Sequence, residues 1–289
     1  MQSHTIPTAP DTTLHVLTST PPTPTSTPTL LFVHFWGGSP RTFSALAARL
    51  SSDFPLILPA LRGWGASAST GPADSALYKI ADSADDLAAV IAHLRREDAA
   101  LFQHGLVLLG HSMGAKIAQL LAARGDLSGL LKGLVLVGPA PLGRLELPAE
   151  MRSQQITAYA SRESAEGALR HVLLGSDVGA DEVRLLVDDC VSGGAHAKAA
   201  WPQYGMQEDY EGFLTAPAQD SKLTIPVAVV VGALDKVETP EKVEERVVRV
   251  LKTAGAAVTL TVLDGVGHLV PVEAPGRLEE VIRSFSATL

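Results

Sequence analysis

The sequence predicts an α/β fold, in which a mostly parallel central sheet is flanked by helices and carries an inserted helical cap. Short apolar runs alternate with helical patterns from residue 29 onward, and this order is typical of a parallel sheet with helices on its faces. Most of the runs are apolar at successive positions, as strands covered on both faces are. The alternation stops between residues 141 and 222, where helical patterns dominate.

Six apolar runs are predicted as strands. They cover residues 30–33, 55–58, 106–109, 134–137, 227–231 and 258–263. The last run alternates in part between apolar and polar positions, which suits a strand at the edge of the sheet. Ahead of the first run, the Thr- and Pro-rich residues 18–29 are expected to form a stiff, exposed connector.

Three helices are predicted outside the insertion from apolar residues at helical spacing. They cover about residues 75–97, residues 240–254 and a last stretch that carries Leu278, Val281, Ile282 and Phe285. Thr239 as the N-cap and Pro240 at the first helical position mark the start of the second helix.

The chain divides into a core and one insertion. Residues 1–140 and 223–289 are assigned to the α/β core, and residues 141–222 to a helical cap or lid between two core strands. Within the cap, helical patterns run over residues 165–174 and 182–191. Because no strong strand run appears in the cap, an independent second domain is the less favoured interpretation.

Composition and charge exclude several classes of partner. The net charge is −8 and no run of Lys or Arg forms a basic patch, so we expect no nucleic acid and no anionic membrane as a partner. The single cysteine, Cys190, excludes an intrachain disulfide and a Cys-rich metal site. No signal peptide and no apolar stretch of spanning length is present, so a cytoplasmic location is expected. Self-association into a homo-oligomer is left open.

The most informative motif is Gly-His-Ser-Met-Gly at residues 110–114. It follows the apolar run 106–109 and precedes the helical pattern of residues 115–121. The spacing G-x-S-x-G between a strand and a helix is that of a nucleophile elbow. Its small residues prevent side chains from colliding with the adjoining strand and helix, and the turn lifts the hydroxyl of Ser112 above the sheet.

A serine nucleophile requires a base, and the base requires an acid that holds its tautomer. In the elbow architecture the chain order is serine, acid, histidine. Asp235 follows the strand run 227–231, and His268 follows the last strand run. Because ligands bind at the carboxyl ends of parallel strands, the three residues are expected to converge. Asp264 is the alternative acid.

An oxyanion hole requires two backbone N–H groups. The residue after the nucleophile, Met113, is expected to supply one of them. The second is expected from the loop His-Phe-Trp-Gly-Gly-Ser at residues 34–39, where glycine allows a close approach of the backbone to the substrate.

Over residues 12–289 the chain resembles proteins with the α/β-hydrolase fold. The motif at 110–114, the loop at 34–38, Arg-Gly-Trp-Gly-Ala-Ser at 62–67, Asp235 and His268 occur in the order of that family. The nearest resemblance is to small cofactor-free esterases and haloperoxidase or perhydrolase-like members. It implies that Trp36 supplies the second oxyanion N–H. The chain departs from the family at Phe35, where glycine is usual, and at Ala60, where aspartate is usual.

The substrate pocket is expected to be apolar and aromatic. Trp36 and Met113 flank the oxyanion position, and Phe35, Trp201 and Tyr204 are the further candidate pocket residues. No metal is expected, because no ligand spacing of a zinc site is present. Residues 63–68 match a dinucleotide-binding pattern, but no helix pattern follows them, so no nucleotide and no other cofactor is expected.

The leading functional prediction is a serine hydrolase that cleaves small apolar carboxylic esters through an acyl-enzyme. Family members with similar residues also open lactones, cleave carbon–carbon bonds of diketones, or make peracids, so these reactions stay open as alternatives. A small-molecule receptor that keeps the triad is the least favoured interpretation. Ser112 argues against the epoxide hydrolases and haloalkane dehalogenases of this fold, which use an aspartate nucleophile.

Overall fold

The computed structural model describes residues 1–68, 71–147, 149–215 and 223–289. Its centre is an eight-stranded sheet in the order β1-β2-β4-β3-β5-β6-β7-β8. Strands β3 to β8 are parallel, whereas β2 runs antiparallel to both β1 and β4. The strands are β1 Gln2–Ala9, β2 Thr12–Ser19, β3 Thr29–Val33, β4 Leu56–Pro59, β5 Leu106–His111, β6 Leu131–Val137, β7 Val227–Gly232 and β8 Val258–Leu263.

All six predicted strands are present, and β8 lies at an edge of the sheet as expected. The hairpin of β1 and β2 was not predicted. In β2 only alternate residues are buried, and two of these are threonines, Thr12 and Thr18. A half-exposed strand of this composition lacks the continuous apolar run that marks the parallel strands. The predicted connector 18–29 is correspondingly shorter, since β2 extends to Ser19 and β3 begins at Thr29.

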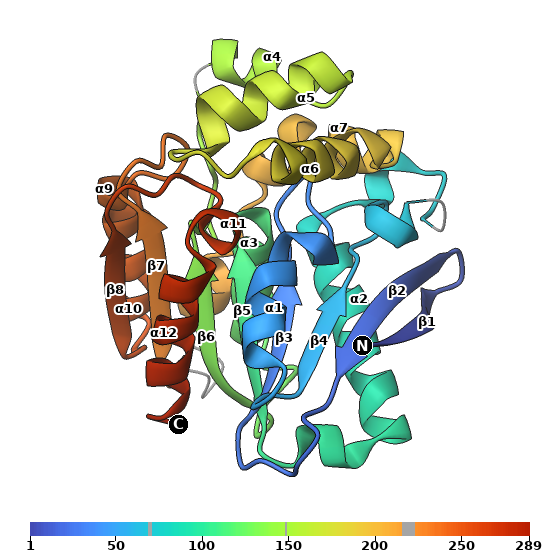
Figure 1. Cartoon of the computed structure of the whole chain (residues 1–289), viewed down its shortest axis with the longest axis vertical. Helices are drawn as coiled ribbons and strands as arrows, with labels where there is room; N and C mark the ends of the chain where they lie inside the picture. Colours follow the sequence, from blue (N-terminus) through green and yellow to red (C-terminus); the bar gives the residue numbers. More distant parts are fainter. Residues whose placement is uncertain (69–70, 148, 216–222) are drawn as a thin grey trace.

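Helices cover both faces of the sheet (Figure 1). One face carries α1 Ser44–Leu50 and α12 Pro275–Ser286, with the short α11 Val270–Glu273 beside them. The other face carries α2 Ile80–Glu97, α3 Met113–Ala123, α9 Pro240–Val243 and α10 Arg249–Thr253. Residues Glu244–Val248 join α9 to α10 as a π-helix, so the predicted helix 240–254 is continuous. Thr239 caps it as predicted.

The core consists of two layers separated by the sheet. In β3, Leu31 and Val33 belong to the layer under α2 and α3, whereas Leu30 and Phe32 belong to the layer under α1 and α12. Successive side chains of a strand point to opposite faces. This explains why β3 to β7, which are covered on both faces, are apolar at almost every position.

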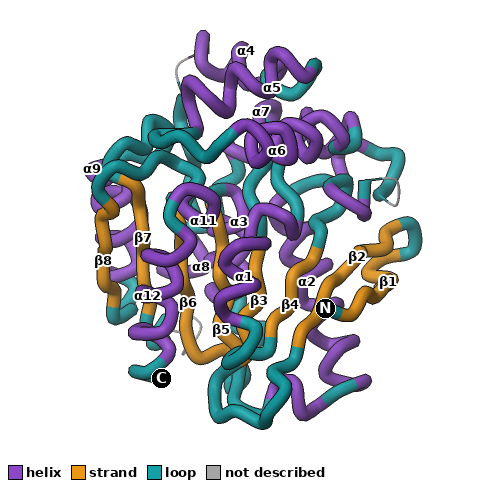
Figure 2. The backbone as a smooth tube through the Cα atoms, in the orientation of Figure 1, coloured by secondary structure: helices purple, strands orange, loops and turns teal. Residues whose placement is uncertain are grey.

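The segment between β6 and β7, residues 141–222, is called the helical insertion below. It contains α4 Ala149–Thr157, α5 Arg162–Ala168, α6 Ala180–Ser192, α7 Ala195–Gln203 and α8 Gly212–Thr215, and a π-helix, Leu169–Leu173, extends α5. In Figure 2 the helices α4 to α7 lie above the carboxyl ends of the strands and no strand crosses them. Both helical patterns predicted here are confirmed.

Buried polar contacts fix the helical insertion to the core. The carboxylate of Asp189 in α6 accepts hydrogen bonds from Ser39 Oγ at 2.8 Å and from Arg41 Nε at 3.1 Å. The buried ammonium of Lys116 in α3 donates to the carbonyl groups of Gly143 and Glu208, each at 2.6 Å. Both ends of the described insertion are thus bonded to one helix of the core.

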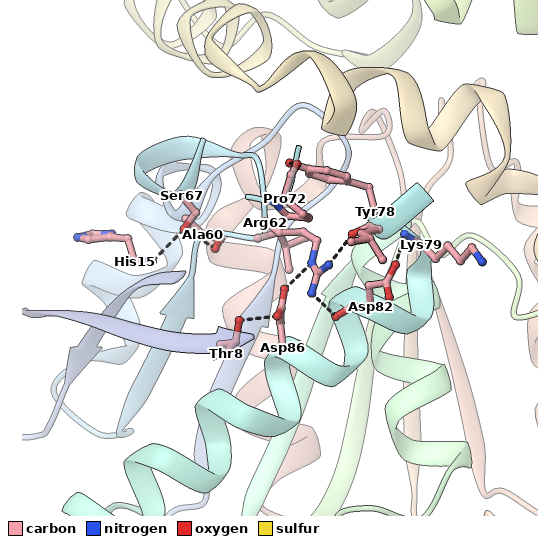
Figure 3. A network of polar contacts seen from close by, with 12 residues as sticks. Thr8, His15, Ala60, Arg62, Ser67, Pro72, Tyr78, Lys79, Asp82 and Asp86 are labelled. Atoms are coloured by element: carbon pink, nitrogen blue, oxygen red, sulfur yellow. Dashed lines mark hydrogen bonds and ion pairs between the residues drawn. The ribbon is translucent and has the colours of Figure 1, made fainter. Parts of the chain in front are cut away.

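A buried ion pair fixes the loop after β4. Arg62 Nε donates to Asp86 of α2 at 2.6 Å, and Thr8 of β1 donates to the same carboxylate at 2.5 Å (Figure 3). The guanidinium also bonds the carbonyl groups of Leu77 and Asp82. This network holds the hairpin, α2 and the loop together beside the site described next. No described helix is long and apolar enough to cross a membrane.

Candidate active site

Ser112 occupies a strained turn between β5 and α3. Its φ of +55° is the only positive value among the described non-glycine residues. Such a conformation costs on the order of 1–3 kcal/mol and tends to occur at functional sites. The N–H of Ser112 donates to the carbonyl of Val137 on the neighbouring strand at 2.9 Å, which holds the turn against the sheet.

The two glycines of the motif are required by space. A Cβ atom at residue 110 would lie 2.5 Å from the Cα of Ala115, and one at residue 114 would collide with the carbonyl oxygen of Val33 in β3. The spacing of the motif therefore follows from the close approach of α3 to β5 and β3 at the point where the chain reverses.

Asp235 and His268 meet at the carboxyl end of the sheet. Asp235 follows β7 and His268 follows β8, and His268 Nδ1 donates to Asp235 Oδ2 at 2.7 Å. The other oxygen of Asp235 accepts the N–H groups of Val237 and Glu238 at 2.8 and 2.9 Å. Both side chains are at most 2% exposed. Asp264, the alternative acid, lies on the surface and does not contact His268.

Each member of this pair shifts the pKa of the other. Burial alone would raise the pKa of Asp235, but the charge and hydrogen bond of His268 hold it below its ordinary value. Burial alone would lower the pKa of His268, but the carboxylate of Asp235 raises it above its ordinary value. A carboxylate bonded to Nδ1 leaves Nε2 free to accept a proton.

A cavity of about 340 Å³ lies between the sheet and the helical insertion. Ser112, His268, Phe35, Trp36 and Trp201 all line it. The structure therefore brings together the serine, the histidine and three of the predicted pocket and oxyanion residues. Most of the remaining lining comes from the helical insertion, including Leu145, Leu147, Gln155, Tyr159, Val172 and Leu173.

The predicted oxyanion donors flank Ser112. Met113 is the first residue of α3, and Trp36 lies in the loop after β3, the strand that pairs with β5. An N–H at the start of a helix has no intrahelical acceptor. Within the described ranges, neither the Met113 nor the Trp36 N–H donates to another group of the protein.

Two predicted contacts differ from the structure. Tyr204 does not line the cavity, because its hydroxyl donates to the carbonyl of Ser75 at 2.5 Å outside it. Met113 lines a second, much smaller space beside Trp64 and is not among the residues that line the cavity. The sequence placed Trp201 and Tyr204 together in the insertion, but it could not tell which of the two side chains faces the cavity.

Two further histidines near the site are structural. His34 accepts the N–H of Leu61 at its Nε2, and burial lowers its pKa to about 4. His111 donates from Nε2 to the carbonyl of His268 at 2.8 Å, and burial lowers its pKa to about 3. Both rings stay neutral at physiological pH and hold the loops that carry Trp36 and His268.

Sequence reasoning missed two residues of the site, Tyr159 and Glu238. Tyr159 packs on Trp36 with ring centroids 4.1 Å apart and donates to the Trp36 carbonyl at 3.1 Å. Glu238 lines the cavity, is 2% exposed, and its Oε1 meets no partner among the described residues. The position of Glu238 three residues after Asp235 is the one sequence signal that could have identified it.

The loop of His268 is bonded to the helical insertion. The His268 N–H donates to the carbonyl of Leu173 at 2.7 Å. Glu273 of α11 bridges the two segments, since one carboxylate accepts N–H groups from Gly175 and Ser176 of the insertion and from Gly267 and Leu269 beside His268, at 2.9–3.1 Å. In the described part of the chain no cluster of three His, Cys, Asp or Glu could hold a metal ion.

Comparisons with known proteins agree with this architecture. An esterase from Exiguobacterium antarcticum is 20% identical, with a TM-score of 0.79 over 99% of this chain and 100% of that chain. An esterase from Rhodococcus sp. ECU1013 is 24% identical, with a TM-score of 0.76 over the full length of both chains. A putative aryl esterase from Burkholderia cenocepacia is 23% identical, with a TM-score of 0.75 over 99% and 98% of the chains.

These likenesses show the fold. Comparison with curated proteins gives no significant match. The sequence pattern of the Alpha/beta hydrolase family, however, matches residues 30–281, which include β3 to β8, Ser112, Asp235 and His268. The chain therefore belongs to the alpha/beta hydrolase family.

Proposed function

We propose that the protein is a serine hydrolase that cleaves small apolar carboxylic esters with Ser112, His268 and Asp235. The observation that carries this proposal is the Asp235–His268 hydrogen bond beside a strained Ser112, with the serine and the histidine on the wall of one cavity. A serine, a base and an orienting acid are the groups that acyl transfer requires.

In the proposed reaction, His268 takes the proton of Ser112 as the hydroxyl oxygen attacks the ester carbonyl. The N–H groups of Trp36 and Met113 stabilise the negative oxygen of the tetrahedral intermediate. His268 then gives its proton to the departing alcohol, and a water molecule activated by the same histidine releases the acid from Ser112. Preorganised donors of this kind contribute a factor of about 100 to 1000 in rate each.

The helical insertion acts as a cap in this proposal. It supplies most of the apolar lining of the cavity, so it excludes water and selects the substrate by shape. Phe35, Trp36 and Trp201 provide flat apolar surfaces for an acyl or alcohol group. A cavity of about 340 Å³ favours short to medium acyl chains over long ones.

The test is hydrolysis of p-nitrophenyl esters of graded acyl length by the wild-type protein and by Ser112→Ala. We expect turnover with short acyl chains and a loss of about 10⁶-fold in kcat in the variant, to the assay background. Ser128→Ala, which changes an exposed serine whose hydroxyl donates to Gly125 in its own turn, is the matched control. Turnover that persists in Ser112→Ala would disprove the proposal.

Labelling by a fluorophosphonate separates the remaining alternatives. A labelled Ser112 without ester turnover would identify a competent nucleophile with another substrate. The same protein would then be assayed with lactones, with diketones, and with acetate plus hydrogen peroxide. A protein that is neither labelled nor active on any of these would act as a receptor or by another chemistry.

A further inference from the structure

Glu238 is an acidic residue of the cavity that the proposed reaction does not use. It lies between the end of β7 and the start of α9, three residues after Asp235. Its side chain lines the same cavity as Ser112 and His268, although the residue is only 2% exposed. It therefore combines deep burial with access to the space in which a substrate would bind.

The position of Glu238 is fixed by its own backbone. Its N–H donates to Asp235 Oδ1 at 2.9 Å, the carboxylate that orients His268. Thr239 directly after it caps α9 and accepts the N–H of Lys242. The residue is thus placed by the same turn that places Asp235.

The carboxyl group of Glu238 lacks a partner where one is expected. Its Oε1 is fully buried, and no group in the described part of the chain donates to it or accepts from it. Buried polar atoms in native proteins are nearly always hydrogen-bonded, because an unpaired one loses its hydration without compensation. Because Glu238 lines the cavity, a ligand bound there can supply the missing partner to its carboxyl group.

The charge state of Glu238 determines what kind of partner it takes. Burial raises its pKa to about 8; His268, Lys242 and Arg246 oppose this shift and Asp235 adds to it. At neutral pH the group is therefore mainly the carboxylic acid, which offers one O–H donor as well as an acceptor. The acid would donate to an oxygen of the substrate.

The remainder of the cavity makes this donor selective. The lining of the cavity is mainly apolar and includes Phe35, Trp36, Leu173 and Val237. Few polar groups in an apolar cavity fix the orientation of a ligand and set specificity. A hydrogen bond made there is also stronger than one made in water.

We propose that Glu238 is a substrate-binding residue whose carboxylic acid donates a hydrogen bond to a second oxygen acceptor of the ester, close to the scissile carbonyl. This inference rests on the proposed ester hydrolysis and narrows its substrate class. The preferred substrates are small apolar esters that carry an ether or keto oxygen in addition to the ester group.

The experiment compares pairs of esters of equal shape that differ in one oxygen. The pairs are p-nitrophenyl butanoate with p-nitrophenyl methoxyacetate, and p-nitrophenyl pentanoate with p-nitrophenyl 3-methoxypropanoate. The readout is the ratio of kcat/KM within a pair, measured for the wild type, Glu238→Gln and Glu238→Leu. Dividing each variant's ratio by that of the wild type cancels the intrinsic reactivity of the esters.

In Glu238→Leu we expect the ratio to fall about tenfold in at least one pair, the size of one net hydrogen bond. In Glu238→Gln, whose amide N–H₂ still donates, the ratio should stay within about twofold of wild type. The wild-type preference should also decline above about pH 8 as the acid ionises, whereas that of Glu238→Gln should not. His268, Asp235, Lys242 and Arg246 are unchanged in both proteins and serve as the common background.

Three outcomes would overturn the inference. In the first, Glu238→Leu lowers kcat/KM equally for both members of each pair, which indicates a structural role or an effect on His268 alone. In the second, Glu238→Gln loses the preference as fully as Glu238→Leu. In the third, the wild-type ratio does not change with pH. If Glu238→Leu fails to fold, the comparison of Glu238→Gln with wild type across pH still decides.

Failure of the proposed function gives a different result. If the wild type hydrolyses none of the four esters, ester hydrolysis is disproved while the binding role of Glu238 is still measurable. Quenching of the fluorescence of Trp36 and Trp201, which line the cavity, then reports the binding of methyl butanoate and methyl methoxyacetate. A preference for the second ligand that is lost in Glu238→Leu supports the inference, and equal binding of both ligands overturns it.

Discussion

At the scale of single residues, the protonation of His268 is the property with the most direct consequence. Its pKa is the result of burial, which lowers it, and of the Asp235 carboxylate, which raises it above 6.5. Because a general base must be neutral, kcat/KM for an ester is expected to rise with pH through this raised pKa and to fall below it.

Replacement of Asp235 by Asn removes the charge that opposes burial. The pKa of His268 should then fall below its wild-type value, and kcat should drop by about 10⁴-fold because the ring is no longer held in the useful tautomer. NMR titration of the His268 ring measures the first effect and ester turnover the second. An unchanged pKa in Asp235→Asn would show that the pair is not electrostatically coupled.

Gly114→Ala tests the packing of the turn around Ser112. The added methyl group would collide with the carbonyl oxygen of Val33, so the free energy of unfolding is expected to fall by about 1–3 kcal/mol. Gly212→Ala is the control, because a Cβ there meets nothing within 4 Å. Equal denaturation midpoints for the two variants would contradict this account of the motif.

Single residues also show what the sequence can and cannot reveal about the site. Ser112, Asp235 and His268 were identifiable because each follows a strand and obeys a fixed chain order. Tyr159 was not, since its contact with Trp36 depends on how α4 and α5 fold back over the sheet. Tyr204 was predicted to line the cavity, but its hydroxyl bonds the carbonyl of Ser75, and no local pattern reveals this contact between the end of α7 and the segment before α2.

At the scale of elements, α6 carries two neighbouring aspartates with different partners, because Asp189 bonds the core whereas Asp188 bonds α5 of the insertion. Asp189 is 4% exposed and bonds Ser39 and Arg41, whereas Asp188 is 41% exposed and pairs with Arg162 on the surface. Asp189→Ala should lower the free energy of unfolding by about 1–3 kcal/mol, since the hydroxyl of Ser39 loses its acceptor.

Asp188→Ala is the matched control for this anchor. A pair of exposed side chains contributes little, so its effect should be too small to resolve in chemical denaturation. The fluorescence of Tyr159 and Trp201 would report whether α6 remains packed on the core. If the two variants were equally stable, the buried contact to Ser39 and Arg41 would not be what holds α6 on the core.

How well each strand could be predicted from the sequence depends on how fully the strand is buried. Strands β3 to β7 are covered on both faces and appear in the sequence as continuous apolar runs. The hairpin of β1 and β2 leaves one side half exposed, and its threonines and histidines hide the alternation. Of the helices of the insertion, α5 with its π-helical extension and α6 were predicted from spacing, whereas α4, α7 and α8 were not. The order of these helices over the cavity depends on tertiary contacts that no local pattern contains.

At the scale of the whole molecule, Lys116 links the core to both ends of the described insertion. Burial lowers the pKa of this lysine from 10.5 to about 8, and nearby carboxylates, Glu208 first among them, partly offset the shift. Between about pH 8 and pH 10.5, Lys116 is therefore protonated in the unfolded chain and neutral in the folded chain. The Lys116 contribution to the free energy of unfolding should therefore rise with pH, by at most about 1.4 kcal/mol per pH unit.

Lys116→Met should abolish this rise between pH 8 and pH 10.5. It should also lower stability at pH 7 by about 1–3 kcal/mol, because the carbonyl groups of Gly143 and Glu208 lose their donor. Urea denaturation at several pH values, compared between wild type and variant, isolates the lysine from the tyrosines that titrate nearby. If the free energies of unfolding of the two proteins changed with pH to the same extent, Lys116 would not be the source of the pH dependence.

The bridge made by Glu273 bears on how new specificities can arise in this molecule. A segment inserted between two strands looks like a module that recombination could exchange between relatives. Here one carboxylate receives N–H groups from the insertion and from both neighbours of His268. A transplanted segment that did not present two N–H groups to Glu273 would leave this carboxylate without two of its four N–H donors, whereas point substitutions in the cavity change its lining and keep the bridge.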